Sequence, residues 1–189
     1  MARLVAVLGS ATAPGRLHQA LSEALARAGA SGEPRTELID LGAVTIAAAD
    51  GRPADQLGDD TAATLETIGA ADAVLLATPV YRGSMTGTLK NLIDHVPTEA
   101  LRGKPVAIVA MGASDHHYLG AERHLRDVLA FFGALVCPTA CYLSSRDFSD
   151  GVVADRAAGE LDELIASALA LARAGLGDLG PDPLGARVR

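Results

Sequence analysis

The sequence predicts one α/β domain, built as a five-stranded parallel sheet with helices on both faces. Short apolar runs without polar alternation recur along the chain, which is typical of strands buried on both sides. Segments with apolar residues at helical spacing follow most of these runs. The chain has 189 residues, 49% of them hydrophobic, which is enough for one well-buried domain and short for two. Strands that alternate with helices indicate parallel pairing.

The first half of the chain supplies two strands and two helices. The apolar run 3–8 (RLVAVL) predicts a central strand, and the apolar stripe over 16–28 predicts the helix that follows it. The segment 35–41 alternates only weakly, so we expect a second strand nearer an edge. The segment 42–60 is loop-like, and 61–71 is expected to be helical.

The second half repeats the pattern. Further strands are expected at 73–77, 105–111 and 134–143, and further helices at 119–132 and 152–174. Between the third and fourth strands another helix is expected, with Ser84 as its N-cap because a serine hydroxyl can accept a bond from a first-turn amide. We therefore expect the domain over 1–174 and a flexible C-terminal tail, rich in Gly and Pro, over 175–189.

Composition excludes several classes of function. The net charge is −7 and the cationic residues are scattered, which argues against nucleic acid or an anionic membrane as a partner. The sequence lacks an apolar run long enough to span a membrane and lacks a signal peptide, so a cytoplasmic location is expected. Cys137 and Cys141 are too few for a closed zinc site and are expected to be small buried residues.

Three polar loops, 9–16, 78–84 and 112–118, follow the first, third and fourth strands. In a sheet of order 2-1-3-4-5 these loops converge at the switch point where open α/β sheets bind ligands. The first loop joins a strand to a helix, and its amides, with Ser10, Thr12 and Arg16, suit a phosphate. It matches neither the Walker pattern nor Gly-x-Gly-x-x-Gly, so by itself it is as readily a simple turn.

Three blocks of sequence carry a resemblance to a known family. They are Gly9-Ser10-x-x-x-Pro14-x-Arg16, Ala77-Thr78-Pro79-Val80-Tyr81, and Ser84-x-x-Gly87-x-Leu89-Lys90-x-Leu92-x-Asp94. With these blocks the chain resembles the NAD(P)H-dependent FMN reductases of flavodoxin-like fold over roughly residues 3 to 172. It is most similar to the branch that supplies reduced flavin to sulfonate monooxygenases.

The resemblance implies FMN and NADPH or NADH as cofactors, a homodimer or homotetramer, and a site assigned by position. The phosphate would lie at Ser10, Thr12, Arg16, Leu17 and His18, the isoalloxazine at Pro79, Val80, Tyr81, Arg82 and Ser84, and its pyrimidine edge at Gly112 and Ala113. Relatives often carry Arg and Ser where this chain has Thr12 and His18, and a second Gly where it has Ala113. They also carry a π-type turn in the region of Arg123 and His124.

The implied reaction is hydride transfer from a nicotinamide to FMN, which belongs to the cofactors themselves. No catalytic side chain is therefore expected, and the sequence contains no Gly-x-Ser-x-Gly elbow or zinc-binding helix motif. Because only Tyr81 is expected to offer an aromatic ring, FMN should exchange as a substrate and pass to a partner monooxygenase. Two alternatives stay open: an FMN-retaining quinone, azo or chromate reductase, and a flavodoxin-like electron carrier. The sequence does not choose between NADH and NADPH.

Overall fold

The computed structural model describes residues 2–12, 14–176 and 179–182. Its main sheet has the strand order β2-β1-β3-β4-β5, with β6 also paired to β4, and every one of these pairs is parallel. The strands are β1 (Arg3–Leu8), β2 (Arg35–Asp40), β3 (Ala73–Pro79), β4 (Pro105–Met111), β5 (Leu135–Val136) and β6 (Cys141–Leu143). The predicted α/β fold with flavodoxin-like order 2-1-3-4-5 is confirmed.

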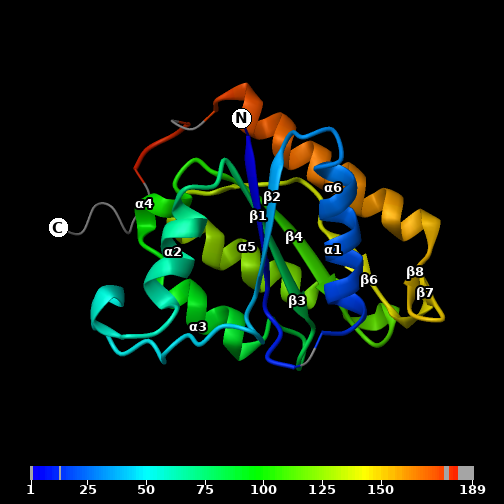
Figure 1. The fold of residues 1–189 in the computed structure, drawn as a ribbon, viewed down its shortest axis with the longest axis horizontal. Helices are drawn as coiled ribbons and strands as arrows, with labels where there is room; N and C mark the ends of the chain where they lie inside the picture. The colour runs from blue at the N-terminus through cyan, green and yellow to red at the C-terminus, as the bar shows by residue number, and fades with distance from the viewer. Residues whose placement is uncertain (1, 13, 177–178, 183–189) are drawn as a thin grey trace.

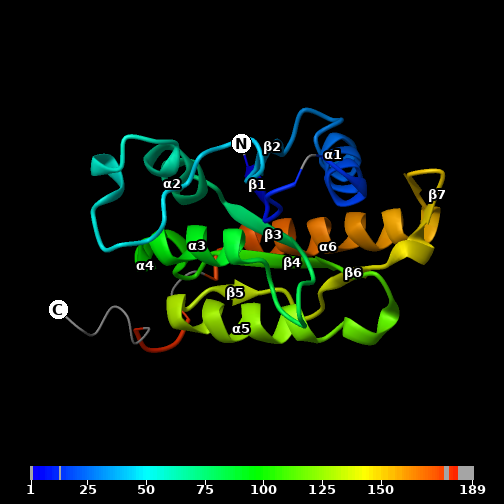
Figure 2. The same ribbon diagram turned by 90° about the horizontal axis from the view of Figure 1, so that it is seen from below.

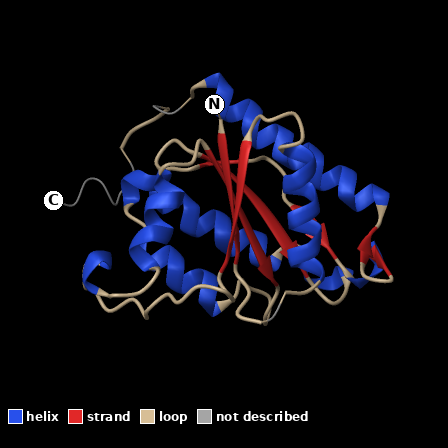
Figure 3. Cartoon of the chain, in the orientation of Figure 1, coloured by secondary structure: helices blue, strands red, loops and turns tan. Residues whose placement is uncertain are grey.

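Burial explains why the strands take this order. β1, β3 and β4 are buried along almost their whole length and occupy the centre, whereas β2 alternates between exposed and covered residues and lies at an edge. Pairing continues to the carboxyl ends, where Leu8 faces Ala77 and Pro79 faces Met111. The loops that follow the central strands therefore all leave the sheet on the same side, where the arrowheads point in Figure 3. We call this side, formed by the carboxyl ends of the strands, the carboxyl edge.

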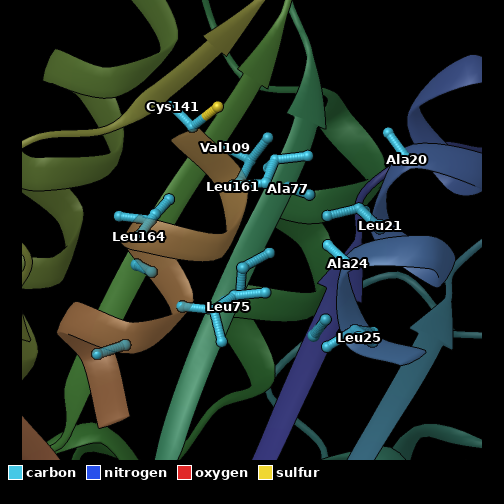
Figure 4. Close-up of a cluster of buried hydrophobic side chains, with 14 of the residues drawn as sticks. Ala20, Leu21, Ala24, Leu25, Leu75, Ala77, Val109, Cys141, Leu161 and Leu164 are labelled. Atoms are coloured by element: carbon cyan, nitrogen blue, oxygen red, sulfur yellow. The ribbon is translucent and has the colours of Figure 1, made fainter. Parts of the chain in front are cut away.

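Helices cover both faces, as Figures 1 and 2 show. α1 (Arg16–Ala28) and α6 (Asp155–Ala174) pack on one face. α2 (Thr61–Gly69), α3 (Gly87–His95), the short α4 (Thr98–Leu101) and α5 (Gly120–Phe132) pack on the other. Figure 4 shows the core of the first face, where leucines and alanines of α1 and α6 close over β3 and β4. Both faces of the sheet are thus buried under apolar side chains, so a polar ligand site is expected at the strand ends.

The last part of the sheet differs from the prediction. The fifth strand is expected over 134–143 but divides into β5 and β6, because Pro138 between them has no amide to donate to a neighbouring strand. Cys137 and Cys141 are free and buried, as expected, and burial raises the pKa of the Cys141 thiol to about 12.

The last helix also begins later than expected, at Asp155 rather than Val152. Residues before it form a small hairpin of β7 (Phe148–Ser149) and β8 (Val152–Val153). Its two connecting residues, Asp150 and Gly151, both have positive φ, 49° and 85°. Asp-Gly is a strong signal for such a turn, and sequence analysis overlooked it.

α6 ends at Ala174 and is capped by Gly175, whose positive φ of 64° is common at the C-terminal end of a helix. Beyond it, Asp182 forms an ion pair with Arg102. Residues 177–178 and 183–189 of the predicted tail lie outside the described residues, so its flexibility stays a prediction. Within the part of the chain that the structure describes, no helix combines the length and the apolar character needed to cross a membrane.

Candidate functional site

The loop after β1 leads directly into α1. Gly9 extends the sheet by donating its N–H to the Ala77 carbonyl at 2.7 Å. A Cβ at Gly9 would lie 2.5 Å from Cβ of Leu89, so only glycine allows α3 to approach β1 this closely. The N-cap of α1 is Gly15, which has no side chain to satisfy the first-turn amides. Those amides and the positive end of the helix dipole suit an anion.

The polar side chains assigned to the phosphate gather around this helix start. The hydroxyls of Ser10 and Thr12 lie 2.9 Å apart. Arg16 is exposed, and Nε2 of His18 lies 3.7 Å from a carboxylate oxygen of Asp40. Leu17, by contrast, is 6% exposed and belongs to the core, so its side chain faces away from any ligand and only its amide is available.

The loop after β3 is a tight turn. Tyr81 and Ser84 exchange backbone hydrogen bonds of 2.9 and 3.1 Å. Between them Arg82 and Gly83 have φ values of 53° and 75°, the left-handed combination of a type I′ turn. This turn leaves the side chain of Tyr81 56% exposed and Arg82 exposed as well. The N–H of Val80 donates to the Met111 carbonyl at 2.8 Å, which ties the loop to the end of β4.

Thr86, not Ser84, is the N-cap of α3. Its hydroxyl accepts from the Leu89 amide at 3.1 Å and donates to the carbonyl of Gly9. Its own N–H donates to the hydroxyl of Thr78 at 3.1 Å. The predicted cap was therefore wrong by two residues. The reason is tertiary, because only Thr86 is placed to bond α3 and the loop after β1 at once.

Ser84 contacts α5 instead. Its hydroxyl lies 2.8 Å from Nδ1 of His124, and a Cβ at Gly120 would come within 2.3 Å of the Gly83 carbonyl oxygen. The turn after β3 is thus held against the start of α5. All residues of α5 are α-helical, so the π-type turn of relatives is not found there, and Arg123 is exposed on this regular helix.

The loop after β4 is supported by β6. Gly112 donates its N–H to the Leu143 carbonyl at 2.9 Å. A Cβ there would lie 2.0 Å from the hydroxyl oxygen of Tyr142, which itself donates to the Ser114 carbonyl at 2.6 Å. Burial raises the pKa of Tyr142, so its hydroxyl stays protonated as the donor. Because the Gly112 amide is engaged within the protein, the amide of exposed Ala113 is the better candidate for a ligand.

Sequence reasoning missed several residues that build this edge. Thr86 and Tyr142 join loops distant in sequence. A second ring, Tyr118, is 55% exposed and lies edge-on to Tyr142 with centroids 6.5 Å apart, so Tyr81 is not the only tyrosine at this edge. Tyr118 lies in one of the predicted polar loops, so its place in the sequence could have indicated a role at the site. Nothing in the sequence indicated such a role for Tyr142.

Hydrogen bonds join these loops to one another. Thr86 bonds the first loop to the second, and Val80 bonds the second to the end of β4. One end offers an uncapped helix start and a cation, the middle an exposed aromatic ring, and the far end a backbone amide. A flat heterocycle bearing a phosphate fits these features. Among the described residues, no three His, Cys, Asp or Glu side chains come together as a metal ion would require.

Comparison with known proteins gives the family. A sequence model of the NADPH-dependent FMN reductases matches residues 2–148. The chain is 38% identical over 154 residues to the NADH-dependent FMN reductase SfnF of Pseudomonas putida, an alignment covering 77% of this chain and 79% of that protein. An NAD(P)H-dependent FAD/FMN reductase of Geobacillus thermodenitrificans is 36% identical over 114 residues, covering 60% of this chain and 62%, less than two thirds, of its own length.

A solved structure agrees with these sequence matches. The apo form of the NADH:FMN oxidoreductase EMOB superposes with a TM-score of 0.73 at 26% identity, covering 98% of this chain and 96% of that one. The family model spans β1 to the start of β7, which includes all three loops of the candidate site. The chain therefore belongs to the NADPH-dependent FMN reductase family.

Proposed function

We propose that this protein is an NAD(P)H:FMN oxidoreductase that passes a hydride from a nicotinamide to FMN. The observation that carries the proposal is the joining of three loops at the carboxyl edge of a parallel sheet, in a chain of the FMN reductase family. When bound, the flavin itself supplies the hydride-accepting chemistry. The protein's task is to bind, orient and align.

In this proposal each loop holds one part of FMN. The amides at the start of α1, with Ser10, Thr12 and Arg16, bind the phosphate. Pro79, Val80 and the exposed ring of Tyr81 line the isoalloxazine, with Arg82 and Ser84 at its rim. The amide of exposed Ala113 would be the donor for the pyrimidine edge, where negative charge grows during reduction.

Flavin exchange is the next part of the proposal. Two of the tyrosines at this edge, Tyr81 and Tyr118, are each more than half exposed, which supports a flavin held on an open surface. We propose that FMN binds loosely, leaves reduced and serves a partner flavin-dependent monooxygenase. That partner rests on the resemblance of the sequence to reductases of two-component systems.

We also propose a homodimer or homotetramer assembled through α3 and α5. Phe131 of α5 is a large apolar ring that is 52% exposed. It lines a hollow of about 270 Å³ whose walls also include Ile93 and Val128 and whose rim carries the Lys90–Asp94 ion pair of 2.6 Å. Light scattering on purified protein tests this assembly, and a monomer at micromolar concentration would refute it.

The function is tested by steady-state oxidation of NADH and NADPH on dialysed protein, with and without added FMN. Absorbance at 450 nm is recorded beforehand to detect bound flavin. We expect colourless protein whose oxidation rate rises and saturates with FMN. Yellow protein that ignores added FMN and accelerates with a quinone would show that flavin is retained. Protein that binds FMN and oxidises neither nucleotide would refute the reductase.

A further inference from the structure

The end of β6 and the segment that follows it contact two of the three loops of the site. Leu143 accepts the hydrogen bond of Gly112, and Arg146 forms an ion pair of 2.9 Å with Asp115 in the loop after β4. On its other side the same segment reaches Arg16 at the start of α1. Residues 143–148 therefore run between the two ends of the proposed FMN site.

Arg16, which is proposed to bind the phosphate, makes two side-chain contacts with this segment. Its guanidinium carbon lies 5.2 Å from the centre of the Phe148 ring, within the range of a cation–π contact. Its Nη2 lies 3.4 Å from the Ser145 hydroxyl. An exposed arginine without such contacts samples many rotamers, and binding an anion would then cost the entropy of fixing one.

The residues that make these two contacts, Ser145 and Phe148, are held in place by packing and hydrogen bonds. Phe148 is half-buried against the core under α1 and α6 and pairs with Val153 in the hairpin. Asp147 beside it is only 7% exposed. The Asp147 carboxylate accepts from the Ser144 amide at 2.7 Å and from its hydroxyl at 3.2 Å, and it is ion-paired with Arg156. Ser145 and Phe148 are therefore fixed by a buried hydrogen-bonded turn.

We propose that Phe148 and Ser145 are positioning residues that hold the Arg16 guanidinium ready for the phosphate of FMN. The proposal rests on the proposed function and goes beyond it by giving the segment after β6 a role in choosing a phosphorylated flavin. A residue that positions Arg16 should affect FMN and riboflavin differently, whereas a purely structural residue should affect both alike. Losing either contact should weaken binding of FMN and leave unaffected binding of riboflavin, which has the same ring system and no phosphate.

The test measures dissociation constants for FMN and riboflavin by flavin fluorescence, on the full chain. Phe148→Leu keeps an apolar side chain against the core and removes the ring. We expect it to raise the dissociation constant of FMN about two- to fivefold, the size of a cation–π contact at an exposed site, and to leave that of riboflavin unchanged. Ser145→Ala should act in the same direction, more weakly, because its contact is long.

Two controls make the result decisive. Val152→Ala changes an exposed residue of the same hairpin, 54% exposed, and should leave both dissociation constants unchanged. In an Arg16→Ala background, Phe148→Leu should have no further effect on the ratio of FMN to riboflavin affinity, because the side chain that it positions is gone. Circular dichroism confirms that each variant is folded; if Phe148→Leu is not, Ser145→Ala carries the test.

Several outcomes would overturn the inference. An equal loss of affinity for FMN and riboflavin would make Phe148 structural only. An unchanged ratio of the two affinities in both Phe148→Leu and Ser145→Ala would show that neither residue positions Arg16. If the wild-type protein binds the two flavins equally well, Arg16 does not recognise the phosphate and the inference is wrong, whereas the proposed reductase function is unaffected. Failure of the wild-type protein to bind FMN at all would refute the proposed function itself.

Discussion

Replacing Thr86 by valine should destabilise the protein far more than its single exchanged atom suggests. The Thr86 hydroxyl is buried and makes two bonds, from the Leu89 amide and to the Gly9 carbonyl. Loss of an N-cap costs about 1 kcal/mol. Leaving the buried Gly9 carbonyl without a donor costs about 1–3 kcal/mol more. We therefore expect the free energy of unfolding to fall by about 2–4 kcal/mol.

Urea unfolding followed by circular dichroism measures this loss, with Thr86→Ser as the matched control. Serine keeps the hydroxyl and removes only a methyl group, so it should cost about 1 kcal/mol. The KM for FMN should rise in Thr86→Val as well, because the hydroxyl joins the loops after β1 and β3. If valine proves as stable as serine, the hydroxyl does not join these loops and the reasoning is wrong.

Other predictions follow from single contacts. Gly159→Ala, at a position of α6 where the new Cβ would meet no atom within 4 Å apart from its chain neighbours and the nearby backbone of its own helix, should stabilise the protein by about 0.5–1 kcal/mol in urea unfolding. Lys104 donates to the last carbonyls of α2 at 2.9 and 2.8 Å. Lys104→Met should therefore lower the free energy of unfolding by about 1–2 kcal/mol, measured by thermal or urea unfolding. Lys90→Met, which removes an exposed ion pair, is the control and should cost about 0.5 kcal/mol or less. Cys141 should be inert to a thiol reagent at pH 8 in the native state and react in denaturant, since burial raises its pKa to about 12. Because the unfolded thiol ionises near its ordinary value of 9.0, the stability from keeping Cys141 neutral should be present below pH 9 and lost as pH rises to about 12, which urea titration across that range would detect.

Local patterns in the sequence were enough for the layers of the fold. Uninterrupted apolar runs mark strands buried on both faces, and 3.6-residue periodicity marks the helices that cover them, so the central strands and α1, α2, α3 and α5 follow from properties of neighbouring residues. The strand order 2-1-3-4-5 came instead from the likeness to flavodoxin-like proteins, and the structure confirms it. The same logic placed the three polar loops at one edge, because parallel strands carry their carboxyl ends together. The hairpin of β7 and β8 was equally local, and its Asp150-Gly151 signal was overlooked.

Contacts between distant segments could not be obtained in this way. Ser84 and Thr86 are both acceptable N-caps by residue type, and the choice falls on Thr86 because the Gly9 carbonyl, 77 residues away, lies beside it. Likewise nothing near Arg16 in sequence predicts its contacts with Ser145, which is 129 residues away, and with Phe148. Periodicity reports what each segment buries. It carries no information on which side chain of one loop meets another, because that depends on the packing of the whole chain.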